Sequence, residues 1–408
     1  MGPRIALTDI AATEQKQKVN PVELAGIFLR LGTTAFGGPA AHIAMMRQEF
    51  VERRQWLSEA EFVDLIGASS LLPGPSSTEV AIFIGLRQAG ATGLVLAGTC
   101  FILPAMLMVM VFAKIYVSCG HLMQSSGILY GIKPVMIAVI AQAIWALGRT
   151  ALRRPEQIVI AAGALILSFF GTVPILLLFV CGAISSSISW ARGHGGQKIA
   201  EQKTAIALIA ALFTFPLLLT FLLPLGSHVL NLSTLFIVFF KFGSTVFGSG
   251  YVLLAYLRDE LVTRLHWLTA RQLLDSIAVG QFTPGPVFTT ATFIGYLLKG
   301  PTGAIVATVG IFLPAFVFVA AAGSMVGKIR SSPITGSFLD GINSAAVALM
   351  AGAEIELAKS ALVDAATIVI ALVCCACLFK FRINSTWMVL AGGLAGLLLK
   401  LVAAHFAF

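Results

Sequence analysis

The chain has 408 residues, of which 58% are hydrophobic and only 11% are charged, and its mean hydropathy is +0.94. A soluble globular domain carries about 25% charged residues, so this composition excludes a water-soluble protein and predicts an integral membrane protein built from helices. The formal net charge of +9 has two open explanations, which are basic loops on the cytoplasmic side of a membrane and a field that attracts anions.

Several protein classes are excluded by motifs that the sequence lacks. There is no G-x-x-x-x-G-K-[ST] loop, so the chain has no ATPase site of its own. The six histidines show no metal-ligand spacing, and the six cysteines are too scattered for a disulfide framework. We therefore expect no enzyme activity, no cofactor, no metal centre and no nucleic-acid partner. Residues 1–20 are polar and lack the apolar core of a signal peptide, so we also expect no cleavable leader.

The first apolar segment is interrupted by glycine and proline at Phe36-Gly37-Gly38-Pro39. Such a break leaves backbone groups unpaired, which is costly in hydrocarbon unless the break is buried in protein or lines a polar cavity. Arg30 lies just before the break among apolar neighbours, and His42 lies just after it. For Arg30, a role at the substrate and snorkelling to the interface are equal alternatives. His42 is a candidate for proton coupling.

A second break follows a helix that is too short to cross a membrane. Ser58-x-x-Glu61 is a capping box. It starts a helix of about fourteen residues, or roughly 21 Å, which ends at Pro73-Gly74-Pro75. The next helix begins there, with the free N–H groups and positive dipole end that suit an oxyanion; a structural kink is the alternative. Its first turn holds Ser76, Ser77 and Thr78 as substrate candidates and Glu79 as a coupling candidate, and Asp64 on the short helix is another.

The remainder of the first half is mostly apolar. Leu94–Val117 is a predicted membrane span, and Ile158–Trp190 is either one long tilted helix or, as we favour, two short helices split at residues 171–174. With the apolar Thr204–Leu225 between the halves, we expect about twelve to thirteen membrane segments in all. The predicted division is a polar segment 1–20, a first repeat 21–192, a connector 193–228 and a second repeat 229–408.

The two halves are copies of one another. Phe28–Pro75 aligns without a gap with Phe239–Pro286, and about a third of the positions are identical. The matches include Gly, Pro, Trp, Arg and Asp in register, which chance similarity between apolar helices would not produce. Because the single connector segment has no partner in the first half, the second copy is predicted to be inverted. Inverted repeats around a site near the membrane midplane are a recurrent design of secondary transporters.

The second copy repeats both breaks, as Phe247-Gly248-Ser249-Gly250 and Pro284-Gly285-Pro286. Lys241 takes the place of Arg30, and Asp275 takes the place of Asp64, whereas His42 and Glu79 have uncharged counterparts. A broken symmetry of this kind is what a specialised site would show. The candidate substrate residues are therefore Arg30, Gly37, Gly38, Pro39, His42, Pro73, Gly74, Pro75, Ser76, Ser77, Thr78, Lys241, Gly248, Ser249, Gly250, Pro284, Gly285 and Pro286, and the coupling candidates are Glu79, Asp64 and Asp275.

Two motifs near the C-terminus have packing explanations. Cys374, Cys375 and Cys377 lie in an apolar run without histidine or carboxylate, so we interpret them as small packing residues rather than metal ligands. Gly392-x-x-x-Gly396 offers a close-packing face, either for a homodimer or for a neighbouring helix of the same chain.

The octapeptide Phe36–Ile43 (FGGPAAHI), the Arg53-Arg54-x-Trp56-Leu57 loop and the duplicated Pro-Gly-Pro resemble the chromate ion transporter (CHR) family in its long two-domain form. The resemblance covers nearly the whole chain. It implies two oppositely oriented homologous halves and a bacterial-type inner-membrane carrier that exports chromate and confers chromate resistance, driven by the proton gradient or the membrane potential. Members of the family are also expected to handle sulfate or similar oxyanions. The second break departs from the family pattern, since Ser249 and Ala255 stand where glycine and proline are common.

Sequence and resemblance together predict an all-α polytopic membrane protein of two inverted repeats. The predicted function is secondary active transport of a tetrahedral oxyanion, with chromate as the substrate. A sulfate or molybdate uptake carrier of the same fold is one alternative. A non-transport membrane subunit is the other, from a different class.

Overall fold

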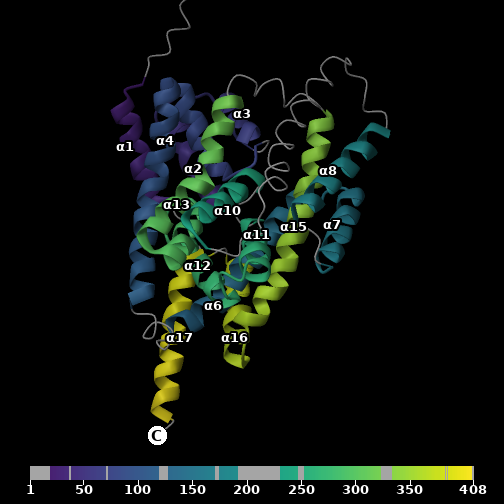
Figure 1. The fold of residues 1–408 in the computed structure, drawn as a ribbon. Coiled ribbons are helices and arrows are strands. Elements are labelled where there is room, and N and C mark those ends of the chain that lie inside the picture. Colours follow the sequence, from purple (N-terminus) through teal and green to yellow (C-terminus); the bar gives the residue numbers. More distant parts are fainter. Residues whose placement is uncertain are drawn as a thin grey trace, which may run out of the picture.

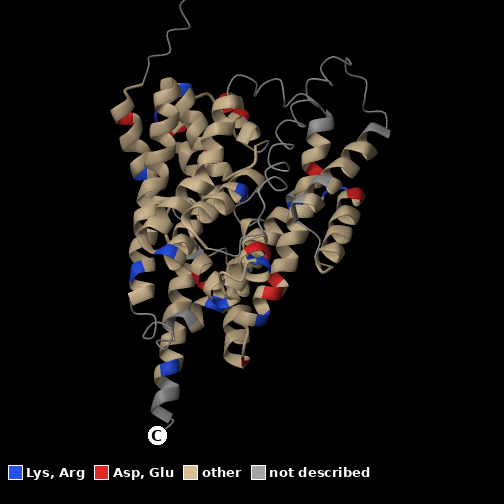
Figure 2. Cartoon of the chain, viewed as in Figure 1, with Lys and Arg blue, Asp and Glu red and all other residues tan. Residues whose placement is uncertain are grey.

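The computed structural model describes residues 19–35, 38–69, 72–118, 127–170, 174–191, 230–246, 252–322, 333–381, 383 and 385–406. Every element in these ranges is a helix. Four of the described helices are long and apolar enough to cross a membrane, and further apolar helices of 10–17 residues accompany them. Figure 2 shows that long stretches of helix carry no Lys, Arg, Asp or Glu. The chain is therefore a multi-pass membrane protein, as its composition predicts.

The helices of the two halves follow in the same order along the chain. The first half contains α1 (Pro21–Thr34), α2 (Gly38–Arg47), η1 (Gln48–Arg53), α3 (Glu59–Ser69), α4 (Ser76–Ser118), α6 (Ile128–Ala151), α7 (Pro155–Ser168) and α8 (Pro174–Ala191). The second contains α10 (Leu232–Thr245), α11 (Val252–Leu257), η2 (Arg258–Arg264), α12 (Ala270–Phe282), η3 (Val287–Thr289), α13 (Thr290–Ala322), α15 (Pro333–Ala361), α16 (Ala365–Lys380) and α17 (Ser385–Phe406). The expected connector span at residues 204–225 lies outside the described residues.

The expected capping boxes start the two short helices. The Ser58 Oγ accepts from the Glu61 N–H at 3.2 Å, and the Ser58 N–H donates to the Glu61 carboxylate at 2.9 Å. Thr269 and Gln272 make the same reciprocal pair ahead of α12. Both helices then stop before a Pro-Gly-Pro segment, as predicted.

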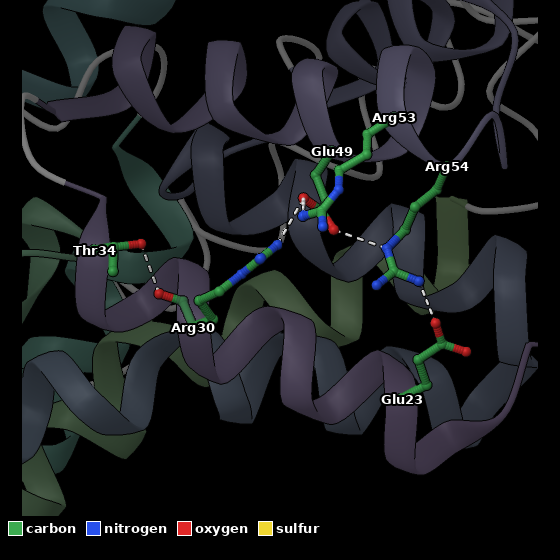
Figure 3. Close-up of polar contacts among 6 residues, drawn as sticks. All are labelled: Glu23, Arg30, Thr34, Glu49, Arg53 and Arg54. Carbon is green, nitrogen blue, oxygen red and sulfur yellow. Dashed lines mark hydrogen bonds and ion pairs between the residues drawn. The ribbon is translucent and has the colours of Figure 1, made fainter.

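In the first repeat, the half-helices on either side of each break return to the level at which they began, rather than forming one kinked span. Arg54, directly after η1, pairs with Glu23 in the first turn of α1, so α1 and α2 lie antiparallel (Figure 3). Arg87 in α4 pairs with Glu61 in α3 at 2.8 Å, which closes a second hairpin with Pro-Gly-Pro at its tip. The sequence predicts the half-helices, but their return to the same side is a property of the tertiary structure.

The long helix α4 is itself two arms joined by a sharp turn at Gly90, where φ is +61°. Gly85 and Gly93 face each other across the turn so closely that a Cβ on either would collide with the other's backbone. α13 repeats this turn at Gly300, with Gly295 against Gly303. The two arms can touch only because all four of these positions lack a side chain.

The two repeats run in opposite directions, as predicted. In Figure 1 the end of α4 lies low in the view, whereas the end of its counterpart α13 lies high. The next helices are inverted in the same way, since α15 begins high in the view and its counterpart α6 begins low. The apolar stretch at residues 158–190 is divided between α7 and α8, which agrees with two short helices rather than one long one.

The halves exchange their last helices. α6 of the first repeat packs against α16 and α17 of the second, and α15 packs against α7 and α8 of the first. At one contact the backbone of Gly131 lies against Gly392 and Gly396. The predicted close-packing face of α17, Gly392 and Gly396, is therefore filled by α6 of the same chain.

We expect Gly131→Val to destabilise this exchanged packing. The new side chain would overlap the Gly392 carbonyl and the Gly396 backbone, and overpacking of this kind costs about 1–3 kcal/mol or more. Gly163→Ala in α7 is the control, because nothing lies within 4 Å of the point that its new Cβ would occupy, and alanine favours a helix by up to about 1 kcal/mol. Thermal unfolding of the purified protein in detergent measures both. Equal midpoints for the two variants would contradict the close packing of α6 on α17.

Candidate functional site

The two Pro-Gly-Pro segments each dock on the other repeat. The Gly74 N–H donates to the Val246 carbonyl at 2.7 Å, and the Gly285 N–H donates to the Ala35 carbonyl at 2.9 Å. Ala35 and Val246 occupy equivalent positions, because they cap the C-termini of α1 and α10 just before the glycine breaks. We call these two residues and the two Pro-Gly-Pro segments the central junction. All of its residues are buried, so the ends of α1 and α10 and the two Pro-Gly-Pro segments meet inside the protein.

The helix starts at the junction are tighter than expected. The Thr78 N–H donates to the Pro75 carbonyl at 2.8 Å, and the Thr289 N–H donates to the Pro286 carbonyl at 3.0 Å. The expectation that the Thr78 amide is free is therefore wrong, because a 3₁₀-type turn uses it. Two side chains in the first turn of α4, in contrast, lack hydrogen-bond partners among the described residues. The Thr78 hydroxyl and both carboxyl oxygens of Glu79 are buried and have no hydrogen-bond partner in the described part of the chain.

His42 links three elements of the first repeat at the junction. Its Nε2 lies 3.1 Å from the Ala35 carbonyl, and its Nδ1 lies 3.2 Å from the Ser77 hydroxyl. Since a carbonyl oxygen only accepts, Nε2 carries the proton, and Nδ1 of the neutral ring accepts from Ser77. The imidazole also meets Phe101 edge-on, with ring centroids 5.5 Å apart. His42 therefore connects the end of α1 to the start of α4.

The other predicted site residues are placed as follows. Gly38 and Pro39 begin α2, and Gly38 has a φ of +77°. Asp64 is exposed on α3, whereas its counterpart Asp275 is fully buried on α12. Four predicted residues lie outside the described ranges, namely Gly37, Gly248, Ser249 and Gly250.

Arg30 and Lys241 each pair with a carboxylate of their own repeat, and the two carboxylates are equivalent. Arg30 lies 2.6 Å from Glu49, and Lys241 lies 3.3 Å from Glu260. Figure 3 shows that Glu49 also forms ion pairs with Arg53 and Arg54. Both basic residues thus have a carboxylate partner within their own repeat, a partnership that the sequence interpretation did not include. Glu49 and Glu260 align with each other in the sequence, but the alignment did not indicate what they do.

The two ion-pair clusters differ in how open they are. The Arg30 side chain is 48% exposed, against 9% for Lys241. A cavity of about 510 Å³ borders the first cluster, lined by Arg30, Leu31, Thr34, Met45, Gln48, Glu49, Glu52 and Arg53. In an inverted-repeat protein, equivalent residues lie toward opposite ends of the molecule. At these equivalent positions, the Arg30 cluster is therefore more exposed than the Lys241 cluster.

A buried polar cluster joins the two repeats at α12, the short helix that precedes Pro284-Gly285-Pro286. Asp275 on α12 lies 3.3 Å from the Lys133 ammonium on α6, and it accepts a hydrogen bond from Tyr116 on α4 at 2.9 Å. The sequence interpretation included Asp275 but missed Lys133 and Tyr116. A signal was present for Lys133, which is a lone lysine in an apolar segment and aligns with Asn343 in the second half. This is the same broken symmetry that indicated His42 and Glu79.

The chain is similar to known proteins over most of its length. A family profile described as chromate transporter matches residues 22–186 and again residues 233–397. The chain is 33% identical over 385 residues to a chromate transport protein of Cupriavidus metallidurans, covering 91% of this chain and 90% of that protein. It is 30% identical to a chromate transport protein of Pseudomonas aeruginosa, with 90% of each covered. A probable chromate transport protein of Synechococcus elongatus is also 30% identical, over 86% of this chain and 88% of the relative. No solved structure matches the chain.

Proposed function

This chain belongs to the chromate transporter family, and we propose that it is a secondary active carrier that exports chromate across the inner membrane of a bacterium and so confers chromate resistance. It would act as a carrier rather than an enzyme. The observation that carries the proposal is the central junction, where the breaks of two inverted repeats pair with each other through Gly74 and Gly285. Substrate sites of inverted-repeat transporters lie at such interfaces between broken helices.

The proposed substrate site is the central junction together with the first turn of α4. The positive end of the α4 dipole lies there, and the hydroxyls of Ser77 and Thr78 can donate to an oxyanion. His42 positions Ser77. Arg30 and Lys241, each paired with a glutamate, would act as basic residues along the route to the site rather than as its only charges. Asp64, Asp275 and Glu79 are the proposed coupling residues.

Export of a dianion is favoured by the electrical potential of a cell whose interior is negative. Each elementary charge contributes about 2.3 kcal/mol per 100 mV, so a dianion contributes about 4.6 kcal/mol. The membrane potential alone could therefore drive export, and a proton gradient could add to it. Uptake of sulfate or molybdate by the same fold would have to overcome this potential by cotransport of cations.

Reconstitution of the purified chain into proteoliposomes tests the proposal. We expect labelled chromate to move toward the positive side when a potential is imposed, without any other protein and without ATP. Gly26→Ala is a matched control, since nothing lies within 4 Å of the point that its new Cβ would occupy and it lies in α1 nine residues before Ala35. A chain that takes up sulfate while chromate neither moves nor competes would overturn chromate export in favour of sulfate uptake. A chain that moves no oxyanion by itself would favour a subunit of a larger assembly.

A further inference from the structure

The first turn of α4 contains a carboxyl group that no ion pair uses. Glu79 is fully buried, and neither carboxyl oxygen has a hydrogen-bond partner among the described residues. It folds back onto the first Pro-Gly-Pro segment, since a Cβ placed on Gly74 would lie 2.5 Å from the Glu79 Oε1. Buried polar groups nearly always have partners. These oxygens are therefore expected to meet a group that binds at the junction.

Among the described residues, the surroundings of Glu79 contain little that could balance a negative charge. α4 contributes the unpartnered hydroxyl of Thr78, and α13 contributes the methyl group of Ala315 close to Gly74. The one titratable side chain that α2 brings to this turn is His42, whose contacts are to Ser77 and Ala35. Burying an isolated carboxylate is far more costly than burying the neutral acid. The surroundings thus favour the acid form, which has an O–H to donate.

We infer that Glu79 binds the transported oxyanion as a neutral carboxylic acid, donating its O–H to an oxygen of the anion held at the first Pro-Gly-Pro segment. The inference rests on the proposed function. An ionised Glu79 would repel a dianion, whereas the acid adds a donor to the positive end of the α4 dipole. The proton stays on Glu79 while the anion is bound, so binding makes and breaks no covalent bond. An environment that keeps a buried carboxylic acid neutral so that it can donate is a known arrangement in enzymes.

A linkage between proton and anion follows. If the anion binds only to the acid form, then chromate affinity must fall as the pH rises through the ionisation of Glu79. His42 could produce a slope of the same sign, because a protonated imidazole would also attract the anion. The contributions of Glu79 and His42 to the pH dependence are separated by replacing Glu79 with an uncharged residue.

Binding of labelled chromate to the full-length protein in detergent, measured by equilibrium dialysis between about pH 6 and about pH 9, tests the inference. For the wild type we expect affinity to fall by up to about tenfold per pH unit above the ionisation of Glu79. Glu79→Gln keeps an N–H donor and is uncharged at every pH, so it should bind chromate with a flatter profile. The titration of chromate itself affects both proteins alike, so the difference between them reports on Glu79. Parallel profiles, or a folded Glu79→Gln that binds no chromate, would overturn the inference.

Glu354 on α15 provides the matched control. Its carboxyl oxygens are also buried without a partner in the described part of the chain, but it lies outside the junction. Glu354→Gln should keep the pH dependence of the wild type, and loss of that dependence would overturn the assignment to Glu79.

A second measurement does not depend on the folding of Glu79→Gln. In infrared difference spectra of the Glu354→Gln protein, chromate should shift the carbonyl stretch of a protonated carboxyl group, and an unchanged band would contradict the inference. If the wild type binds no chromate at any pH, the proposed function fails, and this inference fails with it.

Discussion

Gly285→Ala is expected to abolish chromate transport. Gly285 has a φ of +98°, a region that a residue with a Cβ occupies only under strain of about 1–3 kcal/mol. Its Cβ would also lie 2.6 Å from the Cβ of Ala105 and 3.3 Å from the Gly32 carbonyl. Overpacking adds about 1–3 kcal/mol. Either response, a shifted segment or a partly unfolded protein, breaks the hydrogen bond from Gly285 to Ala35 that joins the two repeats.

The double variant Gly285→Ala/Ala105→Gly separates the two causes. It removes the nearest contact and leaves the backbone strain, so we expect partial recovery of thermal stability and less recovery of flux. Chromate flux in proteoliposomes and unfolding midpoints in detergent are the measurements, with Gly26→Ala as the neutral control. Wild-type flux in Gly285→Ala would show that the second Pro-Gly-Pro segment does not need the geometry described.

Lys133→Met and Asp275→Leu are each expected to destabilise the protein strongly. Breaking a buried ion pair by removing one partner leaves the other charge uncompensated and costs about 3–5 kcal/mol. The Asp275 side chain is fully buried and Lys133 nearly so. The loss should be visible as a large fall in the unfolding midpoint and in the yield of folded protein.

Combining the two substitutions should restore stability, because an apolar pair of similar volume often replaces a buried ion pair without loss. Transport by the double variant then decides the role of the pair. If flux returns together with stability, the pair is structural, and Asp275 is not a coupling residue. If the double variant is stable but does not transport chromate, the pair takes part in the transport cycle. Tyr116→Phe is the milder control, since it removes one hydrogen bond to Asp275, worth about 1–3 kcal/mol to a charged group. A double variant as unstable as the single ones would contradict a direct pairing of Lys133 with Asp275.

Much of the architecture could be predicted because it depends on local signals. The capping boxes at Ser58 and Thr269 begin their helices, and proline prevents those helices from continuing past the breaks. The inversion followed from counting segments. Family membership followed from short motifs in register, since glycine and proline positions reflect backbone requirements that apolar helices do not share by chance.

The partners of the candidate residues could not be predicted in the same way. Arg30 and Glu49 are on different helices, and only the antiparallel return of α2 along α1 brings them together. The glycines of α17 face α6 rather than a second copy, because the halves exchange their last helices. The Thr78 amide is used by a tight turn whose geometry a capping rule does not specify.

The sequence by itself determined that this is a duplicated helical membrane protein with two backbone breaks in each half, since hydrophobicity, capping and proline chemistry act over a few neighbouring residues. Only the tertiary structure decided which break meets which. Gly74 bonds to Val246 and Gly285 to Ala35, residues that are far apart along the chain. The physical reason is that an unpaired backbone group inside a membrane must find a partner, but the chain near the break does not contain that partner, and the opposite repeat supplies it.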